Sequence, residues 1–112
     1  HYGCGGVKAA MSRQRFGILD EWLRQIKDVY YTHRHDIDDV GDANARADRL
    51  VELNIHEQVR NLMKTKVIQK AWHEEQRPII HGWVYSMSDG LLKNLYKVEP
   101  GAKVHEIFQF DF

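Results

Sequence analysis

The sequence predicts an α/β fold in which helices outnumber strands. Two long stretches, 18–33 and 45–64, repeat apolar residues at the three- and four-residue spacing of an amphipathic helix. A later stretch, 79–98, is rich in β-branched and aromatic residues and contains a Ser-Asp-Gly turn signal, which is typical of a β-hairpin. Because a two-stranded hairpin is marginally stable alone, we expect residues 1–112 to form a single, incomplete domain that is part of a larger one.

The composition excludes several classes of protein. The 112 residues are 43% hydrophobic with only two prolines, which favours a small folded domain over disorder. Acidic and basic residues balance at 16 each, which argues against nucleic acid or an anionic membrane as a partner. We find no membrane-spanning run and no signal peptide, and one cysteine cannot form an internal disulfide. We expect a cytoplasmic protein, with an organelle as the alternative, because residue 1 is not methionine and a targeting segment could precede it.

Each predicted helix has an apolar face that should be buried. In the first helix this face contains Ile18, Leu19, Trp22, Leu23, Ile26, Val29 and Tyr30. In the second helix it contains Ala47, Leu50, Val51, Ile55, Val59, Leu62 and Met63. Residues 4–12 predict a glycine-rich turn that leads into a short helix. Residues 65–78 fit a helix better than a strand, and Pro78 ends them.

The C-terminal stretch 104–112 alternates aromatic and polar residues. If it is extended, Phe108, Phe110 and Phe112 lie on one face. An exposed face of this kind favours aggregation, so it should be covered. We expect an edge strand that packs across a subunit boundary, with a strand inside the same subunit as an equal alternative.

The first residues contain the strongest candidate for a metal site. His1 and Cys4 are three residues apart, and an imidazole with a thiolate is a donor pair that suits zinc. Gly5 and Gly6 allow backbone amides to approach the sulfur or a small anion closely. Zinc takes four ligands, however, and the spacing alone slightly favours the alternative in which Cys4 is a small buried hydrophobe and His1 a frayed terminus.

The other histidines give weaker signals. His81 in the predicted hairpin is best interpreted as a packing residue, and His73 and His105 as solvent-facing. His56 could relay protons, since imidazole titrates near neutral pH, but a surface position on the second helix is the simpler interpretation. The sequence therefore leaves the remaining ligands of a site at Cys4 unassigned.

Four segments, read in order, carry a family resemblance. They are "HYGCGGVKAA", "ILDEWLRQIKDVYYTH", "RLVELNIHEQVRNL" and "VIQKAWHEEQRPIIHGWVYSMSDGLLKNL". From residue 1 to about Val98 they resemble the C-terminal part of a β-class carbonic anhydrase, with its His-x-x-Cys-Gly-Gly segment, its Leu-x-Glu-Leu-Asn-Val helix and its Gly-Trp-x-Tyr strand. A single short motif is weak evidence, but four in the same order are strong evidence.

The resemblance implies a fold, a reaction and a set of site residues. The family fold is a mostly parallel sheet flanked by helices, which forms homodimers or higher even oligomers. The implied cofactor is Zn²⁺, with His1 as the zinc histidine, Cys4 as the second zinc cysteine and Gly5 as a catalytic residue whose backbone lies beside the zinc-bound ligand. The implied reaction is reversible hydration of carbon dioxide to bicarbonate and a proton. The family's first cysteine, in a Cys-x-Asp-x-Arg motif, has no counterpart in residues 1–112.

Two other functions stay open at this point. One is a catalytically silent relative that serves as an oligomerisation or scaffold module. The other ignores the resemblance and sees a helical interaction module with an exposed aromatic tail and no metal at Cys4. Because only two of the implied protein ligands are in the sequence, we expect residues 1–112 alone to bind zinc weakly and to show no hydration of carbon dioxide.

Overall fold

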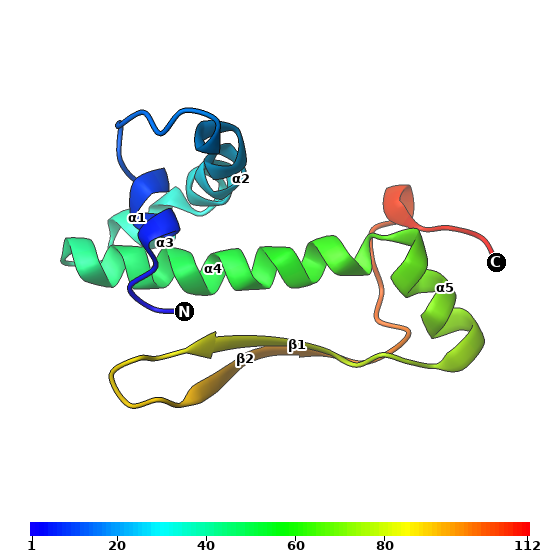
Figure 1. The fold of residues 1–112 in the computed structure, drawn as a ribbon. Coiled ribbons are helices and arrows are strands. Elements are labelled where there is room, and N and C mark those ends of the chain that lie inside the picture. The colour runs from blue at the N-terminus through cyan, green and yellow to red at the C-terminus, as the bar shows by residue number, and fades with distance from the viewer.

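Five helices and one β-hairpin make up the protein, and a computed structural model describes all residues 1–112. The helices are α1 (Gly5–Ala10), α2 (Leu19–Thr32), α3 (Arg34–Asp38), α4 (Ala43–Met63) and α5 (Lys66–Glu75). The strands are β1 (Ile80–Tyr85) and β2 (Leu92–Val98), and a 3₁₀ turn covers Glu106–Phe108. The predicted α/β class is confirmed, as are both long helices, the helix in 65–78 and the hairpin (Figure 1).

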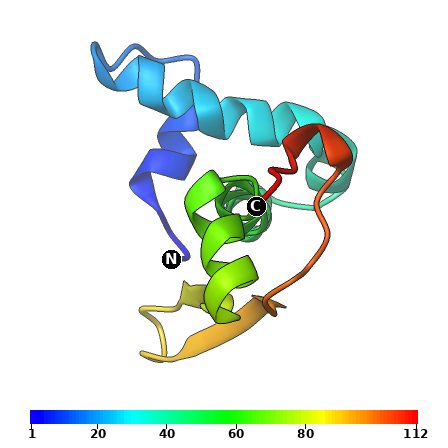
Figure 2. The same ribbon diagram turned by 90° about the vertical axis from the view of Figure 1, so that its right-hand side faces the viewer.

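Helix α4 runs through the middle of the molecule and contacts most other elements. The hairpin lies along one side of α4, while α1, α2 and α3 lie on the other side, over its N-terminal half (Figure 1). Seen along its axis, α4 separates α2 from the hairpin (Figure 2). Asp42 begins this helix, because its Oδ1 accepts a hydrogen bond of 2.8 Å from the backbone N–H of Ala45. Asp42 is therefore the N-cap residue of α4.

The hydrophobic core consists of two clusters that meet along α4 and β1. The first contains Val7, Ala10, Leu23, Ile26, Val29, Ile37, Leu50, Val51, Leu53 and Val84. The second contains Val59, Met63, Trp72, Ile80 and Val98. The radius of gyration is 15.9 Å, whereas a compact domain of this length has about 13 Å. The arrangement is therefore elongated, and only 17 residues are buried.

The buried faces of the two long helices differ from the predicted ones. In α2, Leu23, Ile26 and Val29 are buried, but Ile18 and Trp22 at its start are 89% and 55% exposed. Ile18 precedes the first turn of α2, and Trp22 lies against Gly6 of α1 at the edge of the packed helices. In α4, Leu62 is exposed and Leu53 is buried. Burial extends around α4 because elements pack on it from two sides.

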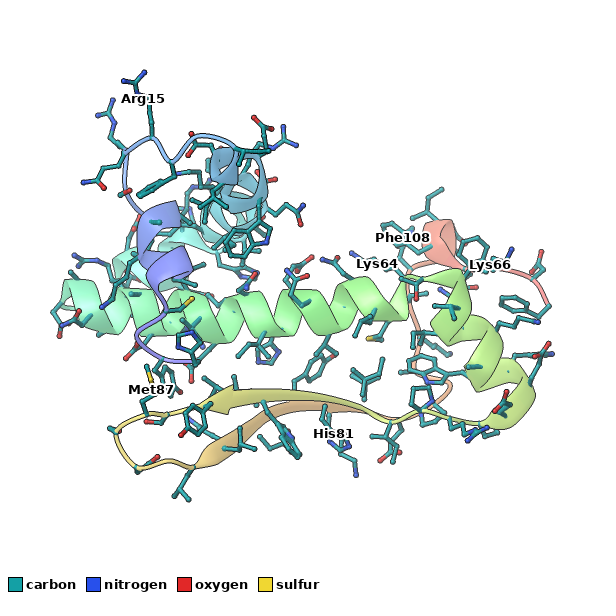
Figure 3. The ribbon with its side chains drawn as sticks, viewed as in Figure 1. Arg15, Lys64, Lys66, His81, Met87 and Phe108 are labelled. Atoms are coloured by element: carbon teal, nitrogen blue, oxygen red, sulfur yellow. The ribbon has the colours of Figure 1, made fainter.

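The two strands pair antiparallel, as predicted for a hairpin. Ile80 pairs with Val98 and Tyr85 with Leu92, with a bulge after Gly82. Burial alternates along β1: Ile80, Gly82 and Val84 face α4, and the intervening residues are exposed. His81 is one of these, so it points away from α4 (Figure 3) rather than into the packed core. Residues 1–112 supply this antiparallel pair and no parallel strands.

The prediction of a strand near the C-terminus is wrong. Residues 106–108 form a 3₁₀ turn, and the segment 105–112 lies on α5 and the end of α4 (Figure 3). The three phenylalanines do not form one strand face: Phe110 and Phe112 lie together, with 6.5 Å between ring centroids, and Phe108 contacts a different part of the protein. Phe108 covers the Lys64 ammonium, 4.7 Å from the ring centroid, whereas Phe112 stacks on His73 at 6.0 Å.

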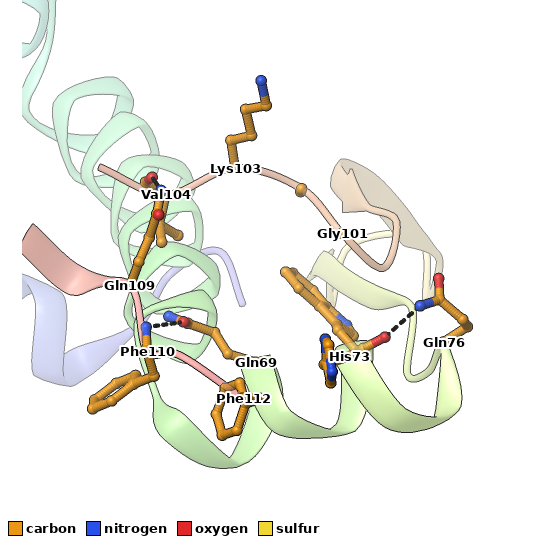
Figure 4. Close-up of a pocket in the computed structure, with 11 residues that line it drawn as sticks. Gln69, His73, Gln76, Gly101, Lys103, Val104, Gln109, Phe110 and Phe112 are labelled. Carbon is orange, nitrogen blue, oxygen red and sulfur yellow. Dashed lines mark hydrogen bonds between the residues drawn. The ribbon is translucent and has the colours of Figure 1, made fainter. Parts of the chain in front are cut away.

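Gln69 of α5 explains why the C-terminal segment does not extend. Its Nε2 donates to the backbone oxygen of Phe108 at 2.9 Å, and its Oε1 accepts from the N–H of Phe110 at 3.0 Å. One side chain therefore satisfies backbone groups that a neighbouring strand would otherwise pair. The shallow pocket beside it (Figure 4) has amide side chains that already bond inside the protein, including Gln76 to the oxygen of Trp72 at 2.7 Å.

At Gly82 the hairpin lies close against α4. A Cβ added there would lie 3.0 Å from Ile55 Cγ2 and 3.1 Å from Val59 Cγ2. We predict that Gly82→Val lowers the free energy of unfolding by about 1–3 kcal/mol through overpacking. Gly41→Val is the matched control, because a Cβ at Gly41 meets nothing within 4 Å, and it should change stability by less than about 0.5 kcal/mol. Urea unfolding of both variants checks this, and equal effects would contradict it.

The Gln69 contacts predict a local effect on the C-terminal segment. Gln69→Ala should release residues 105–112 while the rest of the fold stays intact, because both backbone bonds to Gln69 are lost. Hydrogen exchange followed by mass spectrometry should show faster exchange in this segment and unchanged exchange in α4. Gln58→Ala is the control, since Gln58 bonds only to side chains of α4. Unchanged exchange at 105–112 in Gln69→Ala would refute the assignment.

Candidate metal centre

Cys4 stands immediately before α1 with its thiol uncommitted. It is the N-cap residue of α1, but its side chain makes no capping hydrogen bond. It forms no disulfide, and its side chain is half-buried. Its Sγ lies 3.7 Å from the place where a Cβ on Gly6 would be. Cys4 packs against the first core cluster, which agrees in part with its interpretation as a small buried hydrophobe, but it is only partly buried and its sulfur forms neither a capping hydrogen bond nor a disulfide.

The His1 ring is held in an orientation that leaves one nitrogen free. Its Nδ1 lies 2.9 Å from the backbone oxygen of Tyr2. A carbonyl oxygen only accepts, so Nδ1 carries the proton in this bond and Nε2 of the neutral ring keeps its lone pair. Metal-binding histidines commonly have this pattern, in which a backbone carbonyl fixes the tautomer. The ring is exposed, so nothing in the chain covers Nε2.

The donor chemistry of His1 and Cys4 fits zinc, but residues 1–112 do not complete its shell. An imidazole nitrogen and a thiolate are both ordinary zinc ligands, and a structural or catalytic site uses three or four protein groups. No group of three or more His, Cys, Asp or Glu side chains is placed to hold a metal ion. The chain therefore provides at most two of the ligands.

The other histidines lie away from such a cluster. His73 and His105 are exposed, as predicted, and the exposed His81 ring lies 5.6 Å from that of Trp83. His56 is partly buried against Tyr96 of β2, with 4.8 Å between ring centroids. Burial, and after it Arg49 and Arg60, lower the pKa of His56 below its ordinary value, and His33 acts in the same direction against the opposing effect of Glu52. This environment therefore favours the neutral form of the His56 ring.

Tyr2, between the two candidate ligands, joins their segment to the rest of the fold. Its backbone N–H donates to the oxygen of Tyr85 in β1 at 3.0 Å. Its hydroxyl donates to Oε2 of Glu52 in α4 at 2.7 Å. Burial and the Glu52 carboxylate raise the pKa of Tyr2 to about 12, so the phenol stays protonated and keeps donating. The segment is thus attached to a strand and to the central helix.

The two glycines after Cys4 have different surroundings. A Cβ at Gly5 would meet nothing within 4 Å, so the space next to Cys4 on that side is open. A Cβ at Gly6 would lie 3.1 Å from Cη2 of Trp22. The indole of Trp22 therefore packs directly on Gly6 in the first turn of α1 instead of entering the core. Only glycine fits at position 6 without a shift of that ring.

Sequence reasoning missed three residues around the site: Tyr2, Glu52 and Trp22. Tyr2 lies inside the His-x-x-Cys pattern, but its role cannot be inferred from the sequence because that role depends on its hydrogen-bond partner. Glu52 is 50 residues away, on a helix whose polar positions look alike in the sequence. Trp22 fitted the apolar face of α2, so its spacing concealed its contact with Gly6.

Comparisons with known proteins identify relatives of this chain. The carbonic anhydrase family model matches residues 1–92. A carbonic anhydrase of Emericella nidulans is 46% identical over 110 residues, which is 96% of this chain and 48% of that protein. The chain thus spans about half the length of this relative.

Solved structures give the same result. One of two tetrameric β-carbonic anhydrases from Sordaria macrospora is 32% identical, with a TM-score of 0.81 over 88% of this chain and 50% of that one. The β-carbonic anhydrase of Coccomyxa, solved with acetazolamide, is 29% identical, with a TM-score of 0.81 over 88% of this chain and 46% of that one. The family model, the sequence identity and the shared fold therefore agree that this chain belongs to the β-carbonic anhydrase family.

Proposed function

We propose that this protein takes part in zinc-dependent, reversible hydration of carbon dioxide to bicarbonate and a proton. One observation carries the proposal: His1 Nε2 and Cys4 Sγ are both uncommitted donor atoms in one short, anchored segment. Membership of the β-carbonic anhydrase family supports it. The substrate class follows from the family, because nothing else in residues 1–112 selects one.

In this proposal the residues of the chain hold and orient the cofactor. His1 would bind zinc through Nε2 while the Tyr2 carbonyl keeps its tautomer fixed, and Cys4 would bind as the thiolate. Gly5 would present its backbone in the open space beside Cys4. Bound zinc supplies Lewis acidity, which makes water a nucleophile at ordinary pH. The remaining ligands would come from outside residues 1–112.

We also propose that the protein works as a homodimer or a higher even oligomer. The Sordaria macrospora relatives are described as tetrameric. The hairpin face opposite α4 exposes Trp83, Tyr85 and Leu92, which makes burial by further protein favourable. No helix in the structure combines the length and apolarity that crossing a bilayer requires.

Metal titration tests the site directly. We predict that the 112-residue protein binds Zn²⁺ weakly through His1 and Cys4, and that Co²⁺ in its place gives a thiolate-to-metal absorption band. Cys4→Ser should abolish the band, and both Cys4→Ser and His1→Gln should lower the Zn²⁺ affinity by more than about 100-fold, since even loss of an outer-shell partner costs 10–100-fold. His105→Gln, an exposed histidine elsewhere, is the control and should change neither.

Activity separates the enzyme from the silent relative. Expressed from its complete gene, the protein should hydrate carbon dioxide in a stopped-flow assay and lose that activity with its zinc in Cys4→Ser. The 112-residue chain alone should remain at background. A complete protein that binds zinc but stays at background would favour the oligomerisation or scaffold module, and a protein that binds no zinc would contradict the proposal altogether.

A further inference from the structure

The side chain of Glu52 lies where three parts of the fold meet. It comes from α4, it accepts the hydroxyl hydrogen of Tyr2 from the N-terminal segment, and its Oε2 lies 3.6 Å from the ammonium of Lys93 in β2. The Arg49 guanidinium, one turn earlier in α4, lies 3.7 Å from the other oxygen, Oε1. Two cations on different elements thus orient the carboxylate that holds Tyr2.

Tyr2 has little freedom once its hydroxyl is fixed. Its N–H bonds to Tyr85 of β1, its oxygen bonds to the His1 ring, and its side chain bonds to Glu52. His1 and Cys4 are one and two residues from it along the chain. Any rotation of the Tyr2 backbone therefore moves the imidazole, changes the path to the thiol, or both.

The burial of this pair makes its hydrogen bond strong. The Glu52 side chain is 19% exposed, whereas the acidic partners of the other ion pairs in the structure are 49–63% exposed. A hydrogen bond to a partly buried carboxylate is shorter and stronger than one between neutral groups in water. Among the acidic side chains that form ion pairs, Glu52 is thus the least exposed.

We propose that Glu52 is a positioning residue for the candidate metal centre, which acts through the Tyr2 hydroxyl to set the relative placement of His1 Nε2 and Cys4 Sγ. The inference rests on the proposed function, which supplies the zinc, but the Tyr2–Glu52 hydrogen bond itself requires no metal. Glu52 does not touch zinc or substrate in this role. Its effect is to lower the cost of ordering the two ligands before the metal arrives.

Three single variants and one double variant test the pair. Tyr2→Phe removes only the hydroxyl, and Glu52→Leu removes the acceptor. Both should lower the Zn²⁺ affinity by about 10–100-fold, the usual cost of losing an outer-shell partner. Glu52→Gln keeps an acceptor oxygen for Tyr2 and should restore the affinity to within a few-fold of the native protein. The double variant Tyr2→Phe/Glu52→Leu should bind no more weakly than either single variant, because both remove the same interaction.

Glu57→Leu is the matched control. Glu57 lies on the same helix, is partly buried and forms no ion pair. Its replacement should leave Zn²⁺ affinity unchanged. Thermal unfolding of the metal-free variants separates positioning from general stability. A structural role alone would lower the midpoint and leave the affinity of the folded protein as it was, which would overturn the proposal.

A second measurement tests, in the absence of metal, whether the Tyr2–Glu52 hydrogen bond restrains the segment that carries Cys4. In the metal-free protein, iodoacetamide should alkylate Cys4 several-fold faster in Tyr2→Phe and Glu52→Leu than in the native protein or Glu57→Leu, because the segment moves. If the native protein binds no Zn²⁺, both the proposed function and the positioning role fail. The alkylation rate then reports only whether the Tyr2–Glu52 hydrogen bond holds the N-terminal segment in place. If it binds Zn²⁺, and Tyr2→Phe matches it in affinity and alkylation rate, the positioning role fails while the proposed function stands.

Discussion

The packing of α4 on β1 is the contact on which the rest of the structure depends. These two elements alone contribute residues to both core clusters: Leu50 and Val59 from α4, Val84 and Ile80 from β1. Gly82 lies between the two strand positions, where methyl groups of Ile55 and Val59 would be 3.0 and 3.1 Å from a Cβ at this position. With few buried residues and an elongated shape, the protein has no other layer that could replace this contact.

The candidate metal centre depends on the same contact through Tyr2. The N-terminal segment bonds to Tyr85 at the end of β1 and to Glu52 on α4. The spacing between strand and helix therefore fixes both attachment points of the segment that carries His1 and Cys4. His1 is exposed and Cys4 is half-buried, but the groups that hold their segment come from α4 and β1, the two elements that join the core clusters.

The sequence predicted the elements whose evidence is local. Periodicity located α2 and α4, and the Ser-Asp-Gly turn located the hairpin, because helical and strand spacing depend on near neighbours. The C-terminal strand was wrong because alternating phenylalanines were taken as a strand face. Instead, Gln69 pairs the backbone there, and Phe108 and Phe112 find different partners. These contacts join segments that are distant in the sequence, so no local sequence pattern predicts that they replace strand pairing.

The candidate site divides in the same way. His1, Cys4 and Gly5 are visible in the sequence because they lie in one short motif, and their roles as ligands and catalytic backbone remain predictions. Trp22 on Gly6 and Glu52 on Tyr2 are not visible, since each pair joins distant segments.

The coupling of core and site has a consequence for how substitutions act. A change that separates α4 from β1 shifts Glu52 relative to Tyr85, so it strains Tyr2 even when it lies far from Cys4 in the sequence. Loss of the Tyr2 hydroxyl, in contrast, affects only the site: it releases the segment with His1 and Cys4 but leaves Leu50, Val59 and Val84 packed in the core. Metal affinity should therefore respond to damage in either place, whereas global stability should respond mainly to damage in the core. This difference between metal affinity and stability is expected for a ligand segment that is attached to the core. A segment that formed part of the core would change both quantities together.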